Sequence, residues 1–141
     1  MANEILATMA TYERVHDRSA AASRRALGDA GESLAAVWYQ GHGYEVVARN
    51  WACRSGEVDL VLRDGRLTVF CEVKSRSSLR FGSPGEAVGP LKQLRLRRLA
   101  ALWFASCSSR GEDRHLPGGG PVRFDVACVL GDQVEVLEGA F

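Results

Sequence analysis

One stretch decides the fold, and residues 57–74 read EVDLVLRDGRLTVFCEVK. Asp64-Gly65 is a strong signal for a two-residue turn, and the residues on either side of it alternate as strands do. A turn at that position sets Arg63 opposite Arg66 and pairs the two strands residue by residue from there. The stretch is therefore expected to form a β-hairpin.

The alternation separates an apolar face from a face that carries acids and a lysine. The apolar face comprises Val58, Leu60, Leu62, Leu67, Val69, Cys71 and Val73, so it is expected to pack on a helix. The opposite face comprises Glu57, Asp59, Val61, Phe70, Glu72 and Lys74. In this register Asp59 lies diagonal to Glu72, at a Cβ separation of about 7 Å. Lys74 follows Glu72 on the same face.

Two carboxylates at this spacing suit a magnesium ion, whose oxygen ligands lie at about 2.0–2.1 Å. Bound Mg²⁺ contacts phosphate oxygens and lowers the pKa of a water ligand, which then becomes a nucleophile. An ammonium group beside the ion can position that water or stabilise charge on the phosphate oxygens. The alternative is a hairpin whose outer face is simply polar and solvated, and the short D…ExK pattern alone favours that alternative.

Helices and strands are predicted on both sides of the hairpin. A helix is expected over residues 23–40, where Leu27, Leu34, Val37 and Trp38 recur at helical spacing before Gly41. A strand is expected over residues 44–49. After a loop rich in Ser, Gly and Pro over residues 77–85, Pro90 opens a second helix that runs to about residue 106. The buried side of this second helix is expected to carry Leu91, Leu94, Leu99 and Leu102.

Two more strands are predicted near the C-terminus, after a flexible loop over residues 108–120. Residues 122–130 alternate strictly, and Gly131-Asp132 turns the chain into a last strand over residues 133–137. The predicted order is therefore αβββαββ. Antiparallel strands flanked by helices imply an α/β sandwich around one central sheet.

The composition is that of an ordinary folded protein, with 46% hydrophobic and 25% charged residues. Its 141 residues suit one domain. Residues 23–141 are expected to form that domain. Residues 1–22 are rich in small side chains and are expected to form an arm, which is either flexible or a short amphipathic helix.

Neither a membrane span nor a secretory signal is visible in the sequence. No stretch approaches the ~18–20 consecutive apolar residues that cross a bilayer, and no basic segment precedes an apolar core near the N-terminus. The four cysteines lack metal-binding spacings, so free thiols are expected at Cys53, Cys71, Cys107 and Cys128. We therefore expect a cytoplasmic protein without a membrane partner.

Positive charge is concentrated after the hairpin, although the net charge is only +1. Residues 74–98 hold a single acid, Glu86, and the basic residues Lys74, Arg76, Arg80, Lys92, Arg95, Arg97 and Arg98. A basic face of this kind attracts phosphates. The alternative is the solvated surface of a helix.

Four sequence blocks resemble one known family in their order and spacing. They are Gly31-Glu32-x-x-Ala35, Arg49-Asn50-Trp51-x-Cys53-Arg54-x-Gly56-Glu57-Val58-Asp59-Leu60, Phe70-x-Glu72-Val73-Lys74-Ser75-Arg76, and Lys92-Gln93. The chain resembles the YraN family of uncharacterised bacterial proteins over roughly residues 26–137. That family belongs to the restriction-endonuclease-like (PD-(D/E)XK) nuclease superfamily and is similar to archaeal Holliday-junction resolvases. One mild departure is Ser75, where the family commonly has Thr.

The resemblance implies a restriction-endonuclease-like αβββαββ sandwich with one central mixed sheet. It also implies a catalytic site of Asp59, Glu72 and Lys74, in which Asp59, Glu72 and the helix-borne Glu32 bind Mg²⁺ or Mn²⁺. Glu57 would then either support this site or pair with an arginine. The residues expected to contact nucleic acid are Arg54, Arg76, Lys92, Gln93 and Arg95.

The function implied by the resemblance is that of a metal-dependent endodeoxyribonuclease, a hydrolase of phosphodiester bonds in DNA, including branched or damaged structures. The alternative is a non-catalytic nucleic-acid-binding module that acts with partner proteins in DNA processing. A third possibility is an adaptor between proteins in DNA processing or uptake. A homodimer is one option for the assembly, because small resolvase-like domains are often dimers.

Overall fold

The computed structural model describes residues 2–76, 88–111 and 120–141 of the chain. Within these residues the elements are α1 (Ala2–Gly41), β1 (Glu45–Cys53), β2 (Gly56–Asp64), β3 (Leu67–Arg76), α2 (Pro90–Ser109), β4 (Val122–Leu130) and β5 (Gln133–Leu137). The strands form one sheet in the order β1-β2-β3-β4-β5. The β3–β4 pair is parallel and the other pairs are antiparallel. The predicted αβββαββ order and mixed sheet are therefore confirmed, and the architecture is compatible with the restriction-endonuclease-like fold.

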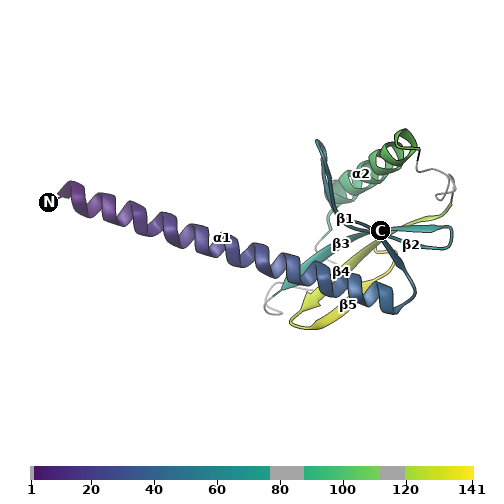
Figure 1. Cartoon of the computed structure of the whole chain (residues 1–141), viewed down its shortest axis with the longest axis horizontal. Coiled ribbons are helices and arrows are strands. Elements are labelled where there is room, and N and C mark those ends of the chain that lie inside the picture. Colours follow the sequence, from purple (N-terminus) through teal and green to yellow (C-terminus); the bar gives the residue numbers. More distant parts are fainter. Residues whose placement is uncertain (1, 77–87, 112–119) are drawn as a thin grey trace.

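The sheet lies between the two helices (Figure 1). On the α1 side, the buried cluster comprises Ala35, Ala36, Tyr39, Leu60, Leu62, Val69, Cys71, Ala127 and Val129. On the α2 side, it comprises Val58, Val61, Phe70, Val88, Leu96, Leu99, Ala100, Trp103, Cys107 and Val126. Each helix thus buries one apolar stripe against one face of the sheet, which is the arrangement expected for an α/β sandwich.

Helix α1 begins much earlier than predicted. It runs without interruption through residue 22, where the sequence suggested the boundary between an arm and the domain. Its C-terminal part lies on the sheet, and the N-terminal part projects beyond it (Figure 1). Ala and Arg are frequent between residues 2 and 27, and these residue types favour helix. The division into arm and domain stays a prediction.

The hairpin turns one residue later than predicted. Gly65-Arg66 forms the turn, so Asp64 pairs with Leu67 and Leu60 pairs with Cys71. Gly65 has φ +56, which a residue without Cβ adopts without steric cost. Each residue therefore faces a partner two positions beyond the predicted one. Side-chain alternation has a period of two, so this shift does not exchange the faces.

Helix α2 buries a different face from the predicted one. Leu91 is 83% exposed and Leu94 is 64% exposed, whereas Leu99 is buried as predicted. Leu102 is also exposed, at 37%. The buried stripe is Leu96, Leu99, Ala100, Trp103 and Cys107. Packing of this stripe keeps the arginines among the leucines in solvent and sets Trp103 edge-on against Phe70 at a ring-centroid distance of 5.6 Å.

Some predictions fall outside the described residues, namely the loop over 77–85 with Arg80 and most of the loop over 108–120. All four cysteines are free thiols, as predicted, and Cys71 and Cys107 are buried. No helix within the described ranges is both long and apolar enough to span a bilayer.

Candidate active site

The alternation of side chains between the two faces of the sheet is interrupted at one position in β1 and β2. This interruption determines where Asp59 lies. Asn50 has φ 49. It lies between the pairs Arg49–Leu60 and Trp51–Val58, and therefore across from Asp59. A left-handed residue within a strand redirects the side chains that follow, as β-bulges do.

The change of faces corrects one predicted position. The sequence predicted Val58 and Leu60 on the same apolar face. Leu60 packs on the α1 side, whereas Val58 packs on the α2 side with Val61. The regular period of two thus fails between Val58 and Leu60, at Asp59 itself.

Asp59 lies where β2 separates from β3. The last backbone pair of this ladder is Leu60–Cys71. Beyond it, the Val73 N–H donates a hydrogen bond of 2.8 Å to Asp59 Oδ2. The side chain takes the place of a main-chain acceptor, so the carboxylate is oriented by the backbone of the neighbouring strand. Asp59 is only 9% exposed.

Glu72 lies on β3 between two lysines. Its Oε1 is 2.5 Å from Lys92 Nζ and 3.4 Å from Lys74 Nζ. Lys74 comes from the same strand face, whereas Lys92 comes from the first turn of α2. The sequence predicted that Lys92 contacts nucleic acid; in the structure its ammonium binds this carboxylate.

The site edge, as we name the region where β2 separates from β3, holds several carboxylates that perturb one another electrostatically. The pKa of Asp59 is raised to about 7, first by burial and then by the negative charge of Glu72. Glu32 and Glu57 raise it further, and the hydrogen bond from Val73 opposes the shift. Asp59 therefore lies within electrostatic reach of both predicted metal partners, Glu72 from β3 and Glu32 from α1.

Glu32 reaches this edge because α1 approaches the sheet closely at Gly31. A Cβ built on Gly31 would lie 1.8 Å from Ser75 Oγ, so no larger residue fits without movement. The pKa of Glu32 is raised, mainly by burial, and a side-chain hydrogen bond with Asn50 opposes that shift. Asn50 thus contributes twice, through its backbone at β1 and through its amide at Glu32.

The predicted catalytic lysine lies beside the acids. The pKa of Lys74 is lowered, first by burial and then by Lys92, while Glu72 acts in the opposite direction. The positive charge of Lys74 is thus less favoured than that of an exposed lysine. An ammonium group of this kind gives up its proton more readily, which suits a group that acts on a reacting phosphate or water.

The donor set fits a divalent ion held by few protein ligands. Within the described parts of the chain, no three or more His, Cys, Asp and Glu side chains gather closely enough to hold a metal. Mg²⁺, however, is often held by one or two carboxylates, with waters and phosphate oxygens as its other ligands. Asp59 and Glu72 supply two such carboxylates, and their mutual repulsion would be relieved by a cation.

The other residues predicted to bind nucleic acid are spread around this edge. Gln93 donates a hydrogen bond of 3.0 Å from its amide to the Val88 carbonyl, so it supports the start of α2. Arg95 is exposed on α2, Arg54 is exposed in the turn between β1 and β2, and Arg76 is partly buried at the end of β3. Their contact with nucleic acid stays a prediction.

The model of a family described as "Uncharacterised protein family UPF0102" matches residues 31–129. The chain belongs to the UPF0102 family. UPF0102 is also called YraN, so the family predicted from the sequence blocks is confirmed.

Relatives in the family match most of the chain. A UPF0102 protein of Beutenbergia cavernae is 51% identical over 108 residues, covering 77% of this chain and 85% of the relative. One from Acidothermus cellulolyticus is 45% identical over 128 residues, covering 86% of this chain and 97% of the relative. The names of these relatives state no reaction.

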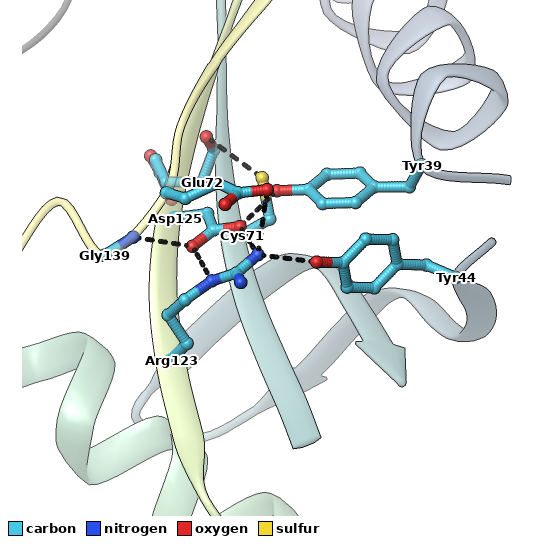
Figure 2. Close-up of polar contacts among 8 residues, drawn as sticks. Tyr39, Tyr44, Cys71, Glu72, Arg123, Asp125 and Gly139 are labelled. Atoms are coloured by element: carbon cyan, nitrogen blue, oxygen red, sulfur yellow. Dashed lines mark hydrogen bonds and ion pairs between the residues drawn. The ribbon is translucent and has the colours of Figure 1, made fainter. Parts of the chain in front are cut away.

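The structure also contains a buried polar network that the sequence did not predict. Asp125 is 1% exposed. Its carboxylate accepts two hydrogen bonds of 2.8 Å from Arg123, one of 2.7 Å from the Tyr39 hydroxyl and one of 3.0 Å from the Gly139 N–H (Figure 2). Arg123 Nη2 also donates to the Tyr44 hydroxyl at 3.1 Å.

This network joins α1, β4 and the C-terminal residues. A signal for it was present in β4, since Arg123 and Asp125 alternate with apolar residues and so share one face of the strand. Opposite charges two residues apart on a strand face are neighbours. What the sequence lacked was the location of Tyr39 and Gly139, which are distant along the chain.

Proposed function

We propose that this UPF0102 chain is a divalent-metal-dependent endonuclease that hydrolyses phosphodiester bonds of DNA, with Mg²⁺ or Mn²⁺ as cofactor. The observation that carries the proposal is the coupling of Asp59 and Glu72 at the point where β2 separates from β3. A buried carboxyl group with a pKa of about 7 beside a second carboxylate is costly to maintain, and such groups concentrate at functional sites.

The residues have separate roles in this proposal. Asp59 and Glu72 would hold the metal, and the Val73 N–H keeps the Asp59 carboxylate oriented for that purpose. A bound ion of this kind supplies a water ligand of lowered pKa and neutralises charge on a phosphate oxygen. Lys74 directs its ammonium group or its proton to the reacting phosphate. Glu32 adds an acid from α1, oriented by Asn50.

DNA is the proposed substrate because exposed arginines follow the site residue Lys92 within a few positions of the sequence. Arg95, Arg97 and Arg98 are exposed on α2, which also carries Lys92. Guanidinium groups pair well with phosphates, and such contacts are independent of base sequence. The resemblance to Holliday-junction resolvases supports branched or damaged DNA as the form that is cut.

One observation favours a second function, that of a non-catalytic nucleic-acid-binding module. The site contains two lysines, Lys74 and Lys92, beside its two strand acids, so the protein supplies positive charge there without a metal. A protein that only binds DNA would use the same basic residues and need no divalent ion. Partner proteins would then supply any chemistry.

Hydrolysis of labelled DNA separates the two functions. The substrates are linear, flapped and four-way DNA, each incubated with Mg²⁺, with Mn²⁺ or with EDTA. We expect cleavage of at least one form with metal and none in EDTA, and a loss of at least about 100-fold in Asp59→Asn. Asp132→Asn is the matched control, because Asp132 is an exposed acid in the turn between β4 and β5. DNA binding by the wild type without cleavage of any form would favour the binding module.

A further inference from the structure

Lys92 contacts Glu72 from a position in helix α2 where a positively charged side chain is unfavourable. It lies in the first turn of α2, which carries no acidic residue. The unpaired N–H groups of a helix N-terminus create a positive potential, so an ammonium group is disfavoured there. Its ammonium nevertheless lies 2.5 Å from the Glu72 carboxylate. The Glu72 carboxylate is therefore what stabilises the charge of Lys92 at this position.

Glu72 in turn has one negative charge and two positively charged neighbours. One carboxylate oxygen contacts two ammonium groups, at 2.5 Å from Lys92 and 3.4 Å from Lys74. Asp59, the second acid of the site, is held by a backbone N–H. The shorter contact comes from the lysine on the helix. Lysine has a flexible four-carbon stem, so its ammonium can change partners without moving the helix.

We infer that Lys92 is a built-in cation that competes with the divalent metal for Glu72 and contacts a DNA phosphate once the metal has displaced it. This inference rests on the proposed function, because it requires a metal at Asp59 and Glu72. Without metal, Lys92 offsets the charge of Glu72 and keeps the acid in place. With metal, the released ammonium lies beside a bound phosphodiester, so metal and DNA strengthen one another's binding.

Mn²⁺ affinity without DNA is the first test, measured by calorimetry on the full chain. Lys92→Met keeps the length of the side chain and removes its charge, so we expect Mn²⁺ to bind roughly threefold to tenfold more tightly than in the wild type. Lys92→Arg retains the charge and should stay near the wild type. Arg98→Met is the matched control, because it removes a positive charge from an exposed position of the same helix. Its effect should be small, since solvent and salt screen exposed charges.

DNA affinity is the second test, measured with a phosphorothioate oligonucleotide that resists hydrolysis. Mn²⁺ should strengthen binding of this oligonucleotide by the wild type at least about threefold more than by Lys92→Met. Failure of the inference and failure of the proposed function have different signatures. Mn²⁺ binding by the wild type that is equal or weaker in Lys92→Met overturns the inference and leaves the metal site standing. Lack of Mn²⁺ binding by both proteins overturns both proposals.

Discussion

Two buried aspartates lie in the same sheet, and their surroundings differ. Asp125 on β4 accepts hydrogen bonds from Arg123, Tyr39 and the backbone of Gly139. Asp59 on β2 accepts one from the backbone of Val73 and lies near a second carboxylate, and burial together with that carboxylate raises its pKa to about 7. Burial of a charged group is favourable only when partners replace the lost water.

The difference suggests how to tell a structural acid from a functional one. The Asp125 network is complete within the protein, and its partners join three separate parts of the fold. The surroundings of Asp59 are unfavourable within the protein and would improve with a cation. A strained, buried acid next to another acid is therefore the stronger indication of a ligand site.

Lys74 provides the largest effect that this comparison predicts. If the Asp59 edge is catalytic, Lys74→Ala should reduce cleavage by roughly 1000-fold, because the lysine acts on charge that develops in the transition state. Binding of DNA and of Mn²⁺ should change little, since Lys74 is the more distant of the two lysines around Glu72. Single-turnover cleavage and DNA-binding titrations measure the two quantities, with Arg66→Ala as the control, because Arg66 is an exposed basic residue in the turn between β2 and β3. Undiminished cleavage in Lys74→Ala would place the active site elsewhere.

Replacement of the structural acid should affect stability instead. Asp125→Asn removes the shorter and more buried of the two ion pairs of Arg123, so we expect a loss of about 3–5 kcal/mol in the free energy of unfolding. Asp59→Asn should lose far less, because it removes a charge that the fold disfavours. Urea denaturation at neutral pH gives both values. Equal losses in the two variants would show that the aspartates do not differ in the way described.

The pH dependence of stability is expected to show a smaller effect, which concerns Asp59 alone. The folded protein raises the pKa of Asp59 to about 7 from an ordinary value of 3.8, so between these pH values the folded state holds a proton that the unfolded chain releases. Stability from this group is therefore lost as pH rises across that window. Asp59→Asn lacks the effect, so its stability relative to the wild type should increase by roughly 3–4 kcal/mol from pH 4 to pH 8.

The measurement is urea denaturation of both proteins across this pH range, without divalent metal. Asp132→Asn is again the control, since an exposed acid should show a flat difference. Mn²⁺ at pH 8 should lower the stability of Asp59→Asn relative to the wild type, because the metal stabilises the wild type only. A difference that does not depend on pH would mean that Glu72 and burial do not perturb Asp59 as described.

Much of the fold could be predicted from sequence because local patterns specify it. Alternation within residues 57–74 correctly assigned Leu60 and Leu62 to one face and Val61 and Phe70 to the other. The motif blocks identified the family. Helix α2 was harder, because two stripes of its surface are apolar and only packing against Phe70 and its neighbours selects one of them.

The candidate site divides in the same way. The sequence by itself determined the candidates Asp59, Glu72, Lys74 and Glu32, since strand periodicity and family motifs depend on neighbouring residues. Only the tertiary structure decided that Asn50 reverses the strand faces, that Lys92 binds Glu72 and that Asp125 meets Tyr39. These contacts join residues far apart in the chain. Their geometry depends on how helices and strands pack, which local sequence does not specify.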